Sequence, residues 1–310
     1  MPYSLITDKI DYAIEKKLEI AKLADLSGNP TWNQIINNLE SAKNKLVFLG
    51  TNEFESFSFT GASPNGYYVW RTANNIYYTF GGITYILDVD THTWTEHSFS
   101  GTFVPYYGSQ IWFWENKAYY SNGVSQQYVF DEANNTWVAK TWNITIQPYY
   151  LWNDGTNLYM SSGSANYVLS DEDTGTWETI TWTTTPSPLY GSDIWNWKGK
   201  TYYSNNSLQY ELVNGNWVAK SWGSSGLTSV NGESVWNDGN VVYCASTNAK
   251  HYLDEDSNTW KIKTWTGLTN FSNNDIWTDG VDYYYNGTYR LNKPKTWSEV
   301  ITEINKLANI

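Results

Sequence analysis

The sequence predicts an all-β fold, a six-bladed β-propeller of four-stranded antiparallel blades, with an N-terminal α-helical segment and a short C-terminal helix. Three observations lead to this prediction. Short runs rich in Trp, Tyr, Val and Phe alternate with turn-forming residues, and a landmark tryptophan returns about every 41 residues. At both ends of the chain, by contrast, apolar residues recur three or four positions apart, which is the spacing of a helix.

The first segment, residues 1–46, is predicted to be helical and to serve attachment or oligomerisation. Its apolar stripe consists of Ile10, Ile14, Leu18 and Ala21, with charged residues between them. This pattern is typical of an amphipathic helix, and a capping box that begins at Thr31 starts a second one. The helices either pack beneath the following domain or form a stalk for docking, and the sequence leaves both readings open.

The next segment, residues 47–293, is predicted to be the propeller. Its repeating unit is clearest in residues 111–142, where four aromatic and β-branched runs are separated by turns, as in a four-stranded meander. The first run of every copy carries an aliphatic residue followed by a tryptophan, and these tryptophans lie 42, 40, 43, 41 and 41 residues apart. They are Trp70, Trp112, Trp152, Trp195, Trp236 and Trp277.

The two ends of the propeller are predicted to meet in one blade. A capping box at Thr296 predicts a C-terminal helix over residues 294–310, which leaves the sixth copy only three strands of its own. Residues 53–60 align with the fourth strand of the first copy, so that Phe54 matches Trp94 and Phe59 matches Phe99. We therefore expect residues 53–60 to close the last blade, with a strand around Trp297 as the alternative.

The repeated tryptophans are predicted to be packing residues. Trp137 and Trp142 are five positions apart, so they point to opposite faces of one sheet. Both faces of a blade are covered by neighbouring blades. The repeated rings should therefore lie between blades and not stack on a ligand.

The first copy resembles the kelch repeat. It carries a double glycine at Gly81 and Gly82, followed by Tyr85, Asp88 and Trp94. Later copies keep the tyrosine and the tryptophan but replace the double glycine. The resemblance covers residues 65–293. It implies a propeller, and the kelch family contains binding modules, scaffolds and a few oxidases, so it implies no particular activity.

Ligand-binding residues are predicted on the loops that enter each blade. The position two residues before each landmark tryptophan begins the innermost strand at the mouth of the channel. These positions hold Tyr68, Gln110, Tyr150, Asp193, Ser234 and Asp275. The incoming loops add Tyr106, Tyr107, Tyr149, Tyr190 and Phe271. The loops between second and third strands add polar residues, namely Ser121 with Asn122, Ser161 with Ser162, Ser204 with Asn205 and Asn206, and Thr247 with Asn248. Exposed rings among Asn, Ser and Asp side chains suit a glycan or a protein surface, and ordinary solvated loops are the alternative.

Composition and charge exclude several partners. The net charge of −12 argues against binding to nucleic acid or to an anionic membrane. No apolar run is long enough for membrane insertion, and the first residues do not form a secretion signal. The single cysteine, Cys244, excludes an internal disulfide and occupies a core position of the repeat.

Enzyme classes known on propellers fit the sequence poorly. A sialidase needs an arginine cluster, and the chain has only Arg71 and Arg290. A copper oxidase needs histidines that converge at the axis, which the positions of the three histidines do not favour. A carbohydrate-active enzyme would use Asp193 and Asp275 as paired carboxylates. The acidic turns between third and fourth strands offer few oxygens for calcium, so no metal and no cofactor are predicted.

The function predicted from these features is that of a non-enzymatic virion structural and binding protein. The helical leader and the charge-poor, Asn- and Tyr-rich composition resemble those of phage virion appendage proteins, such as tail or head fibres. This resemblance implies a phage particle as the location, other virion proteins as partners of the helices, and a host-surface glycan or protein as ligand of the propeller. A homo-oligomer, a cytoplasmic kelch-type adaptor and a carbohydrate-active enzyme remain as alternatives.

Overall fold

The computed structural model describes residues 46–47, 53–124, 126–206, 208–224, 230–239, 241–246, 249–255, 257–265, 275–280, 282–292 and 295–296. The chain divides into two compact units, one from Phe54 to Leu291 and one that combines residues 1–53 with 292–310. In the second unit, β1 (Leu46–Val47) pairs with β28 (Lys295–Thr296) in an antiparallel ladder. Leu46 and Lys295–Thr296, which fall within the segments predicted to be helical, form strand instead. The rest of the helices predicted within residues 1–46 and 294–310, and the alternative strand at Trp297, lie outside the described residues.

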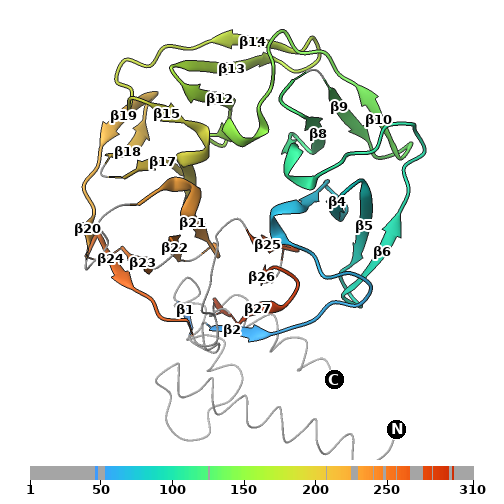
Figure 1. Cartoon of the computed structure of the whole chain (residues 1–310). Coiled ribbons are helices and arrows are strands. Elements are labelled where there is room, and N and C mark those ends of the chain that lie inside the picture. The colour runs from blue at the N-terminus through green and yellow to red at the C-terminus, as the bar shows by residue number, and fades with distance from the viewer. Residues whose placement is uncertain are drawn as a thin grey trace, which may run out of the picture. The chain divides into compact units, whose positions relative to one another are not determined.

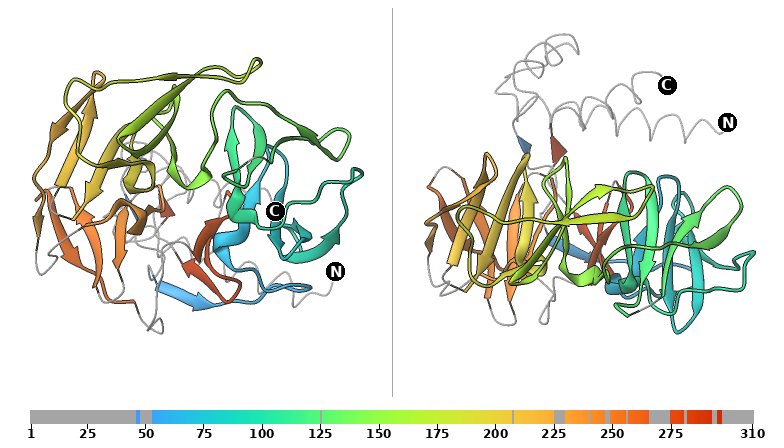
Figure 2. Two further views of the ribbon diagram at one scale, coloured as in Figure 1. Left: turned by 45° about the horizontal axis from the view of Figure 1, so that its top comes forward. Right: turned by 90° about the horizontal axis from the view of Figure 1, so that it is seen from above.

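The larger unit is a ring of six β-sheets, which Figures 1 and 2 show from three directions. Within each sheet, consecutive strands pair antiparallel from the innermost strand outward. Blade one contains β3 (Val69–Arg71), β4 (Ile76–Phe80), β5 (Ile83–Asp88) and β6 (Thr93–His97). Blade two contains β7 (Ile111–Trp114), β8 (Lys117–Ser121), β9 (Gln127–Asp131) and β10 (Thr136–Ala139). Blade three contains β11 (Leu151–Asn153), β12 (Leu158–Gly163), β13 (Ala165–Asp171) and β14 (Thr176–Thr179).

The other three blades follow the same plan. Blade four contains β16 (Ile194–Trp197), β17 (Lys200–Asn205), β18 (Leu208–Val213) and β19 (Asn216–Ala219). Blade five contains β21 (Val235–Asn237), β22 (Val242–Ser246), β23 (Ala249–Asp254) and β24 (Thr259–Ile262). Blade six contains β25 (Ile276–Thr278), β26 (Tyr283–Tyr285), β27 (Tyr289–Asn292) and β2 (Glu53–Ser56). Two short strands extend this plan, because β15 (Leu189–Tyr190) pairs with β12 and β20 (Gly223–Ser224) runs parallel to β24.

The sixth blade joins the two ends of the ring. Its outer strand is β2, which lies next to β27 although the two are more than two hundred residues apart in sequence. Beyond β2, Thr60 pairs in parallel with Thr93, so the chain passes directly onto the outer edge of blade one. The backbone amide of Trp94 donates to the carbonyl of Thr60 at 2.8 Å. Residues 53–56, part of the segment whose sequence aligns with a fourth strand, thus form the fourth strand of blade six.

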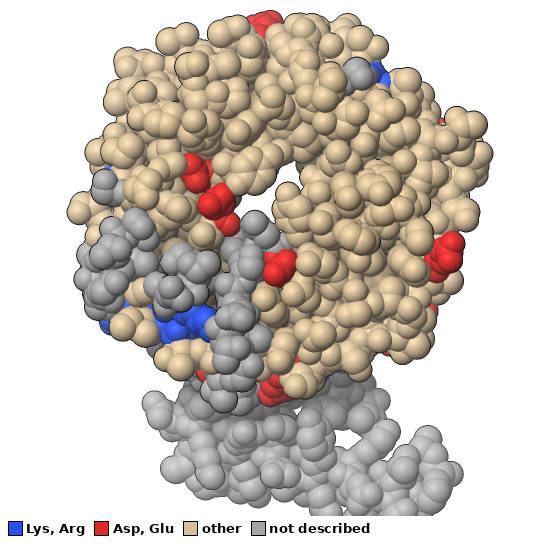
Figure 3. Space-filling model, viewed as in Figure 1, with Lys and Arg blue, Asp and Glu red and all other residues tan. Residues whose placement is uncertain are grey.

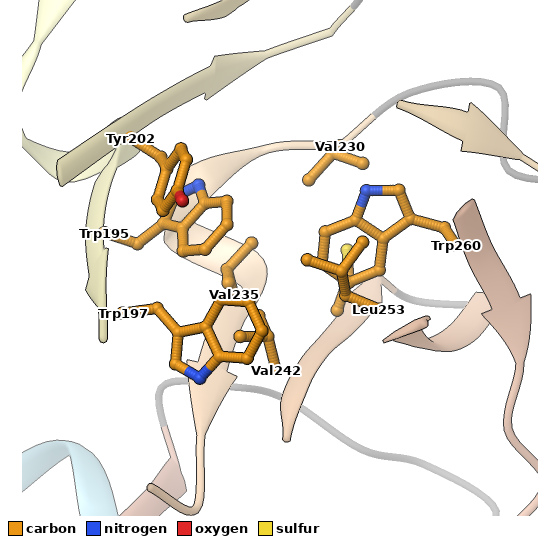
Figure 4. Packing of buried hydrophobic residues seen from close by; sticks show 9 residues of the cluster. Trp195, Trp197, Tyr202, Val230, Val235, Val242, Leu253 and Trp260 are labelled. Atoms are coloured by element: carbon orange, nitrogen blue, oxygen red, sulfur yellow. The ribbon is translucent and has the colours of Figure 1, made fainter. Parts of the chain in front are cut away.

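The interfaces between blades are built from a repeated group of aromatic rings. In each blade the landmark tryptophan stacks on the tyrosine seven residues later, with ring centroids 4.2–4.6 Å apart. Between blades three and four, Trp152 and Tyr159 are joined by Trp182 from the end of blade three and Trp217 from β19. Figure 4 shows the equivalent cluster between blades four and five, which includes Trp195, Tyr202 and Trp260. The blades are thus held together by stacked rings that water does not reach.

The closing blade uses the same packing with smaller rings. Phe54 of β2 lies 5.1 Å from Trp265 and 6.2 Å from Trp236, where other blades place a tryptophan. Phe59 lies 5.4 Å from Trp277 and 6.0 Å from Trp94, on the other side of the sheet. The five-residue spacing therefore sends one ring into each interface, as it does for Trp137 and Trp142.

Candidate ligand-binding face

A ring of short turns surrounds one mouth of the central channel. Before its innermost strand, each of the first five blades forms a single 3₁₀ turn. The turns are η1 (Gly66–Tyr68), η2 (Gly108–Gln110), η3 (Pro148–Tyr150), η4 (Gly191–Asp193) and η5 (Gly232–Ser234). Each turn lies against the next one around the ring, so their last residues form a circle at the mouth. The sequence predicted these positions as strand starts, whereas the structure places them at the ends of turns.

Close approach between turns requires glycine. A Cβ atom on Gly108 would lie 1.8 Å from the carbonyl oxygen of Tyr68 in the preceding blade. A Cβ atom on Gly232 would lie equally close to the carbonyl oxygen of Asp193. Any other residue would push these backbones apart, so the glycines hold the mouth residues of neighbouring blades together.

The first aromatic cluster lies over blades one and two. Tyr107 is stacked on Tyr68 with centroids 5.5 Å apart, and Phe80 packs against both rings. Tyr67 and Tyr106 stand edge-on beside this pair. The cluster is anchored by backbone pairing, because Phe80 and Tyr107 form an antiparallel bridge. It is nevertheless open to solvent, since Tyr106 is 55% exposed.

The second aromatic cluster lies over blades three and four. Tyr150 is stacked on Tyr190 with centroids 5.8 Å apart, and Tyr149 stands edge-on to Tyr150 at 5.5 Å. Tyr190 is positioned by β15, where it pairs with Ser162 of β12. We call the two clusters together the aromatic rim. Its members are Tyr67, Tyr68, Phe80, Tyr106, Tyr107, Tyr149, Tyr150 and Tyr190.

The remaining side of the mouth is acidic. Asp193 ends η4 and is only 6% exposed, and Asn205 donates to its carboxylate at 2.6 Å. Burial raises the pKa of Asp193, and the nearby charge of Glu233 adds to this shift. Asp275 directly precedes β25, and burial also raises the pKa of its carboxyl group. Figure 3 shows the result, with acidic side chains at the edge of the central opening and a largely uncharged face around them.

One hydrogen bond joins the aromatic and acidic sides. The hydroxyl of Tyr149 in η3 donates to the carboxylate of Glu233 in η5 at 2.5 Å, bridging past blade four. Burial and this bond raise the pKa of Tyr149 to about 12, so the phenol stays protonated as a donor. The tyrosine ring is held in place although it is 50% exposed.

The structure therefore brings most of the predicted residues together at one mouth. Tyr68, Gln110, Tyr150, Asp193 and Ser234 each end a turn of the ring. Phe271 lies outside the described residues. The expected single patch of Tyr106, Tyr107, Tyr149 and Tyr190 is instead two clusters, one on each side of Gln110 in the ring of turns.

Sequence reasoning missed three residues of this face. Tyr67 and Glu233 occupy the middle position of their turns, which the search for residues two before the tryptophan passed over. The same middle position in η3 holds Tyr149, so this register was the available signal. Phe80 ends a second strand beside the double glycine, a position that sequence reasoning did not consider.

Three serines expected to face a ligand are instead structural. Ser161 and Ser204 accept hydrogen bonds from the indoles of Trp152 and Trp195, at 2.9 and 3.1 Å. Ser121 donates to the carbonyl of Ile146 at 2.6 Å. All three are buried, so they are not open to a ligand.

The acidic turns on the opposite face satisfy their own backbone. Asp88 accepts from the amides of Asp90 and Thr91, and Asp171 accepts from that of Thr174. These bonds hold the pKa of both carboxyl groups below the usual range. Within the described part of the chain, no group of three or more His, Cys, Asp or Glu side chains could hold a metal ion.

None of the helices described here is long and apolar enough to cross a bilayer.

Comparisons with known proteins find similarity of structure but not of sequence. No protein-family model and no curated protein sequence matches the chain, so the kelch likeness of the first repeat stays a resemblance. The extracellular domain of BT4673 from B. thetaiotaomicron is 9% identical with a TM-score of 0.49, covering 78% of this chain and 40% of that one. The extracellular domain of BT3049 from the same organism is 11% identical with a TM-score of 0.42, covering 81% and 35%.

A third similar structure is YCF48 bound to D1 peptide. It is 14% identical with a TM-score of 0.46, and the match covers 80% of this chain and all of that one. The match to the extracellular domain of BT4673, by contrast, covers only 40% of the length of that chain. At these identities the similarities carry no assignment of ligand or activity.

Proposed function

We propose that this chain is a non-enzymatic binding protein and that the aromatic rim at the mouth of the propeller holds its ligand. The observation that carries the proposal is the exposure of the two ring clusters. The landmark tryptophans of the blades are buried in interfaces, whereas Tyr106 and Tyr149 of the rim are 55% and 50% exposed beside half-buried stacked pairs. Exposed aromatic patches of this kind are typical of interaction sites.

The rim suits a ligand with flat apolar faces and polar edges. A tyrosine ring can stack on the C–H face of a sugar or on an apolar side chain, and its hydroxyl adds a hydrogen bond. Gln110, Ser234 and the backbone of the turns supply further polar groups beside the rings. A host-surface glycan or a segment of another protein fits these features.

The proposal includes a phage particle as the setting. The apolar stripe of Ile10, Ile14 and Leu18 would be wet in an isolated helix, so it is suited to contact other helices or another virion protein. Changing Ile14→Asp together with Leu18→Asp should prevent incorporation into particles while the near-UV circular dichroism of the propeller is retained. Normal incorporation of this variant, measured by mass spectrometry of purified particles, would contradict the attachment role.

Binding to a glycan array and to intact host cells tests the rim itself. The double change Tyr107→Ala and Tyr190→Ala removes one ring of each stacked pair. Loss of two anchoring rings should weaken binding by about thirtyfold or more, because a hot-spot residue contributes roughly 2 kcal/mol. The matched variant, Tyr107→Phe with Tyr190→Phe, keeps both rings and should retain most of the affinity. Equal binding by all three proteins would place the ligand elsewhere.

A second candidate function is favoured by one observation. The raised pKa values of Asp193 and Asp275 at one mouth are what a general acid of a carbohydrate-active enzyme needs. A screen of glycan hydrolysis, with Asp193→Asn as the inactive control, distinguishes this candidate. Hydrolysis that this substitution abolishes would replace the binding proposal with an enzymatic one.

A further inference from the structure

We propose that the first aromatic cluster, over blades one and two, docks an uncharged proline-rich segment of another protein in the polyproline II conformation. This inference rests on the proposed function, because it names the ligand class of one part of the same rim. The argument comes from the exposed surface of the cluster, from the uncharged sequence that forms it, from the arrangement of its rings and from the pairing of its backbone.

The first aromatic cluster exposes several large apolar side chains to solvent. Tyr67 is 42%, Phe80 is 48% and Tyr106 is 55% exposed, and Ile83 is 49% exposed. The two-glycine turn between β4 and β5 sets Phe80 and Ile83 directly opposite each other, so both side chains lie on the same side of the sheet. Exposed rings thus adjoin an exposed aliphatic group, and a combined apolar surface of this kind is typical of a site that binds another molecule.

The ring of Phe80 is not required by the repeat. It stands two residues after the tyrosine of the second strand, and blades two to five carry a polar residue at the equivalent position. Those residues are Asn122, Ser162, Asn205 and Ser246. A blade can therefore fold with a short polar side chain here, and Phe80 adds apolar surface that the fold does not need.

The sequence that forms this cluster is uncharged. Residues 61–70, 72–87 and 98–114, which include η1, η2 and β4, contain no Asp, Glu, Lys, Arg or His. The carboxylates of the mouth turns, Asp193 and Glu233, belong to blades four and five instead. Because a charge buried against an apolar surface without a partner is costly, the segment that covers blades one and two should be uncharged.

The rings of the cluster change direction from one to the next. Tyr68 and Tyr107 are stacked with centroids 5.5 Å apart, and the ring of Tyr67 stands at 69° to that of Tyr68. The ring of Tyr106 stands at 82° to that of Tyr107, with centroids 4.6 Å apart. Upright rings beside a stacked pair give an aromatic surface of the kind on which proline-rich segments dock in other recognition domains. The proline ring is apolar and fixed in conformation, so little conformational entropy is lost when it binds.

The hydroxyl groups of the cluster match the backbone of such a segment. A polyproline II chain forms no internal hydrogen bonds, so its carbonyl groups need donors from outside. Desolvation raises the pKa of Tyr107, and the neighbouring phenols of Tyr106 and Tyr68 raise it further. The phenol of Tyr107 therefore stays neutral, and the cluster offers hydroxyl donors without adding charge.

Two other ways of binding a peptide fit this cluster less well. An added strand needs a free strand edge, but the loop that leads into blade two already pairs with the end of β4. Phe80 and Tyr107 form an antiparallel bridge there, and the amide of Gly82 donates to the carbonyl of Tyr106 at 3.1 Å. A helix bonds its own carbonyl groups, so it could not accept from the tyrosine hydroxyls through its backbone.

A neutral glycan also fits this cluster less well. A sugar ring carries several hydroxyl groups, and each one that loses water on binding needs a polar partner. The side-chain oxygen of Asn65 already accepts from the amide of Tyr67 at 2.9 Å, and that of Gln110 accepts from the hydroxyl of Tyr120 at 3.1 Å. The exposed side chains of Phe80 and Ile83 form no hydrogen bonds, so they would cover sugar hydroxyls without replacing their water.

The experiment measures binding of decaproline, capped at both ends, to the full chain by calorimetry. Two related probes accompany it, namely decaproline built from D-proline, which has the same composition but the opposite hand, and cellohexaose, which is an uncharged glycan. We expect decaproline to bind with an affinity that hardly changes as salt is added, because neither partner contributes charge to the contact. The other two probes should bind about tenfold more weakly or less.

Variants of the cluster test which residues make the contact. Phe80→Asn introduces the residue type that blades two and four carry at this position, and it should weaken decaproline binding by about tenfold while the fold is retained. Tyr106→Ala should weaken binding to a similar extent, whereas Tyr106→Phe keeps the ring and should retain most of the affinity. Val218→Asn is the matched control, because Val218 is 50% exposed on β19 of blade four and should not affect binding. Equal losses in Phe80→Asn and Val218→Asn would overturn the proposal.

Other outcomes separate this inference from the proposed function. Equal binding of the two mirror-image peptides would show unspecific apolar contact and overturn the inference, as would a failure of decaproline to bind. Tighter binding of cellohexaose than of decaproline, abolished by Tyr107→Ala with Tyr190→Ala, would overturn the inference and support the rim as a glycan site. Failure of the proposed function would instead appear as binding to host cells that no change at the rim affects.

Discussion

The same ring types occur in two regions of this molecule, and they do different work in each. Between the blades, Trp217 is 1% exposed and contacts rings of two neighbouring tryptophans, Trp152 and Trp182. On the rim, Tyr106 is 55% exposed and contacts Tyr107 on one edge. Burial from water is the main stabilising term for an aromatic side chain. Rings in the interfaces therefore stabilise the fold, and rings on the rim leave most of their apolar area for a partner.

The largest loss of stability should follow from removing a tryptophan ring from an interface between blades. Trp217→Ala would open a cavity between blades three and four and should lower the free energy of unfolding by about 3–5 kcal/mol. Denaturant unfolding followed by near-UV circular dichroism measures this change. Tyr106→Ala is the rim counterpart and should stay within about 0.5 kcal/mol of the parent protein. Similar losses in both variants would remove the distinction between the two regions.

The second largest loss of stability should follow from breaking the hydrogen bonds around the hydroxyl of Tyr119, an interface tyrosine. The hydroxyl of Tyr119 in blade two donates to Glu172 of blade three at 2.9 Å, and Lys117 and Lys140 lie 2.8 and 3.1 Å from the same carboxylate. Partial burial alone would raise the pKa of Glu172, but these bonds outweigh it and hold the pKa at about 2. Because the folded pKa is depressed, the contribution is present above about pH 4.5 and is lost as pH falls toward 2.

Glu172→Gln tests that contribution. The substitution should cost about 2 kcal/mol at neutral pH, since one side chain loses its charge within a partly buried group of partners. The difference between the parent protein and the variant should shrink as pH is lowered from 4.5 toward 2. A difference that stays constant over this range would show that the charge of Glu172 does not stabilise the interface.

The smallest effect on stability should come from the rim pairs. Tyr107→Ala with Tyr190→Ala removes one stacked contact from each cluster and should cost about 1 kcal/mol in total, because both rings are partly exposed. Thermal unfolding measures the loss. A cost that approaches that of Trp217→Ala would mean that the rim is part of the core, and its proposed ligand site would be misplaced.

The fold was accessible to sequence reasoning because its stabilising residues repeat. The landmark tryptophan, its tyrosine and the five-residue pair at the end of each blade recur in register, and Phe54 with Phe59 keeps that spacing in the closing strand. The site was only partly accessible. Its positions were found by counting from the tryptophan, but the bond from Tyr149 to Glu233 joins residues 84 apart in sequence, which no local pattern reveals.

The serines show where local reasoning went wrong and how it could be improved. Ser161 and Ser204 looked like loop residues open to a ligand, yet each is buried beside an indole. In both blades the serine follows the landmark tryptophan by nine residues, and Thr79 does the same after Trp70. In these three blades the hydroxyl supplies the acceptor for a buried indole N–H, which explains why a small polar residue occupies this position.

The closing strand also decides how the molecule bears mechanical load. The N-terminal segment is covalently continuous with β2, so tension on that end reaches the hydrogen bonds between β2 and β27 before it reaches the aromatic interfaces. The next resistance is the passage of residues 57–60 onto blade one, where Phe57 and Phe59 pack edge to face and Thr60 is hydrogen-bonded to the backbone of His92 and Trp94. Pulling along the direction of these strands would shear several bonds at once instead of opening them one by one. In a propeller tethered by its N-terminus, β2 would therefore both transmit the force and keep the ring closed.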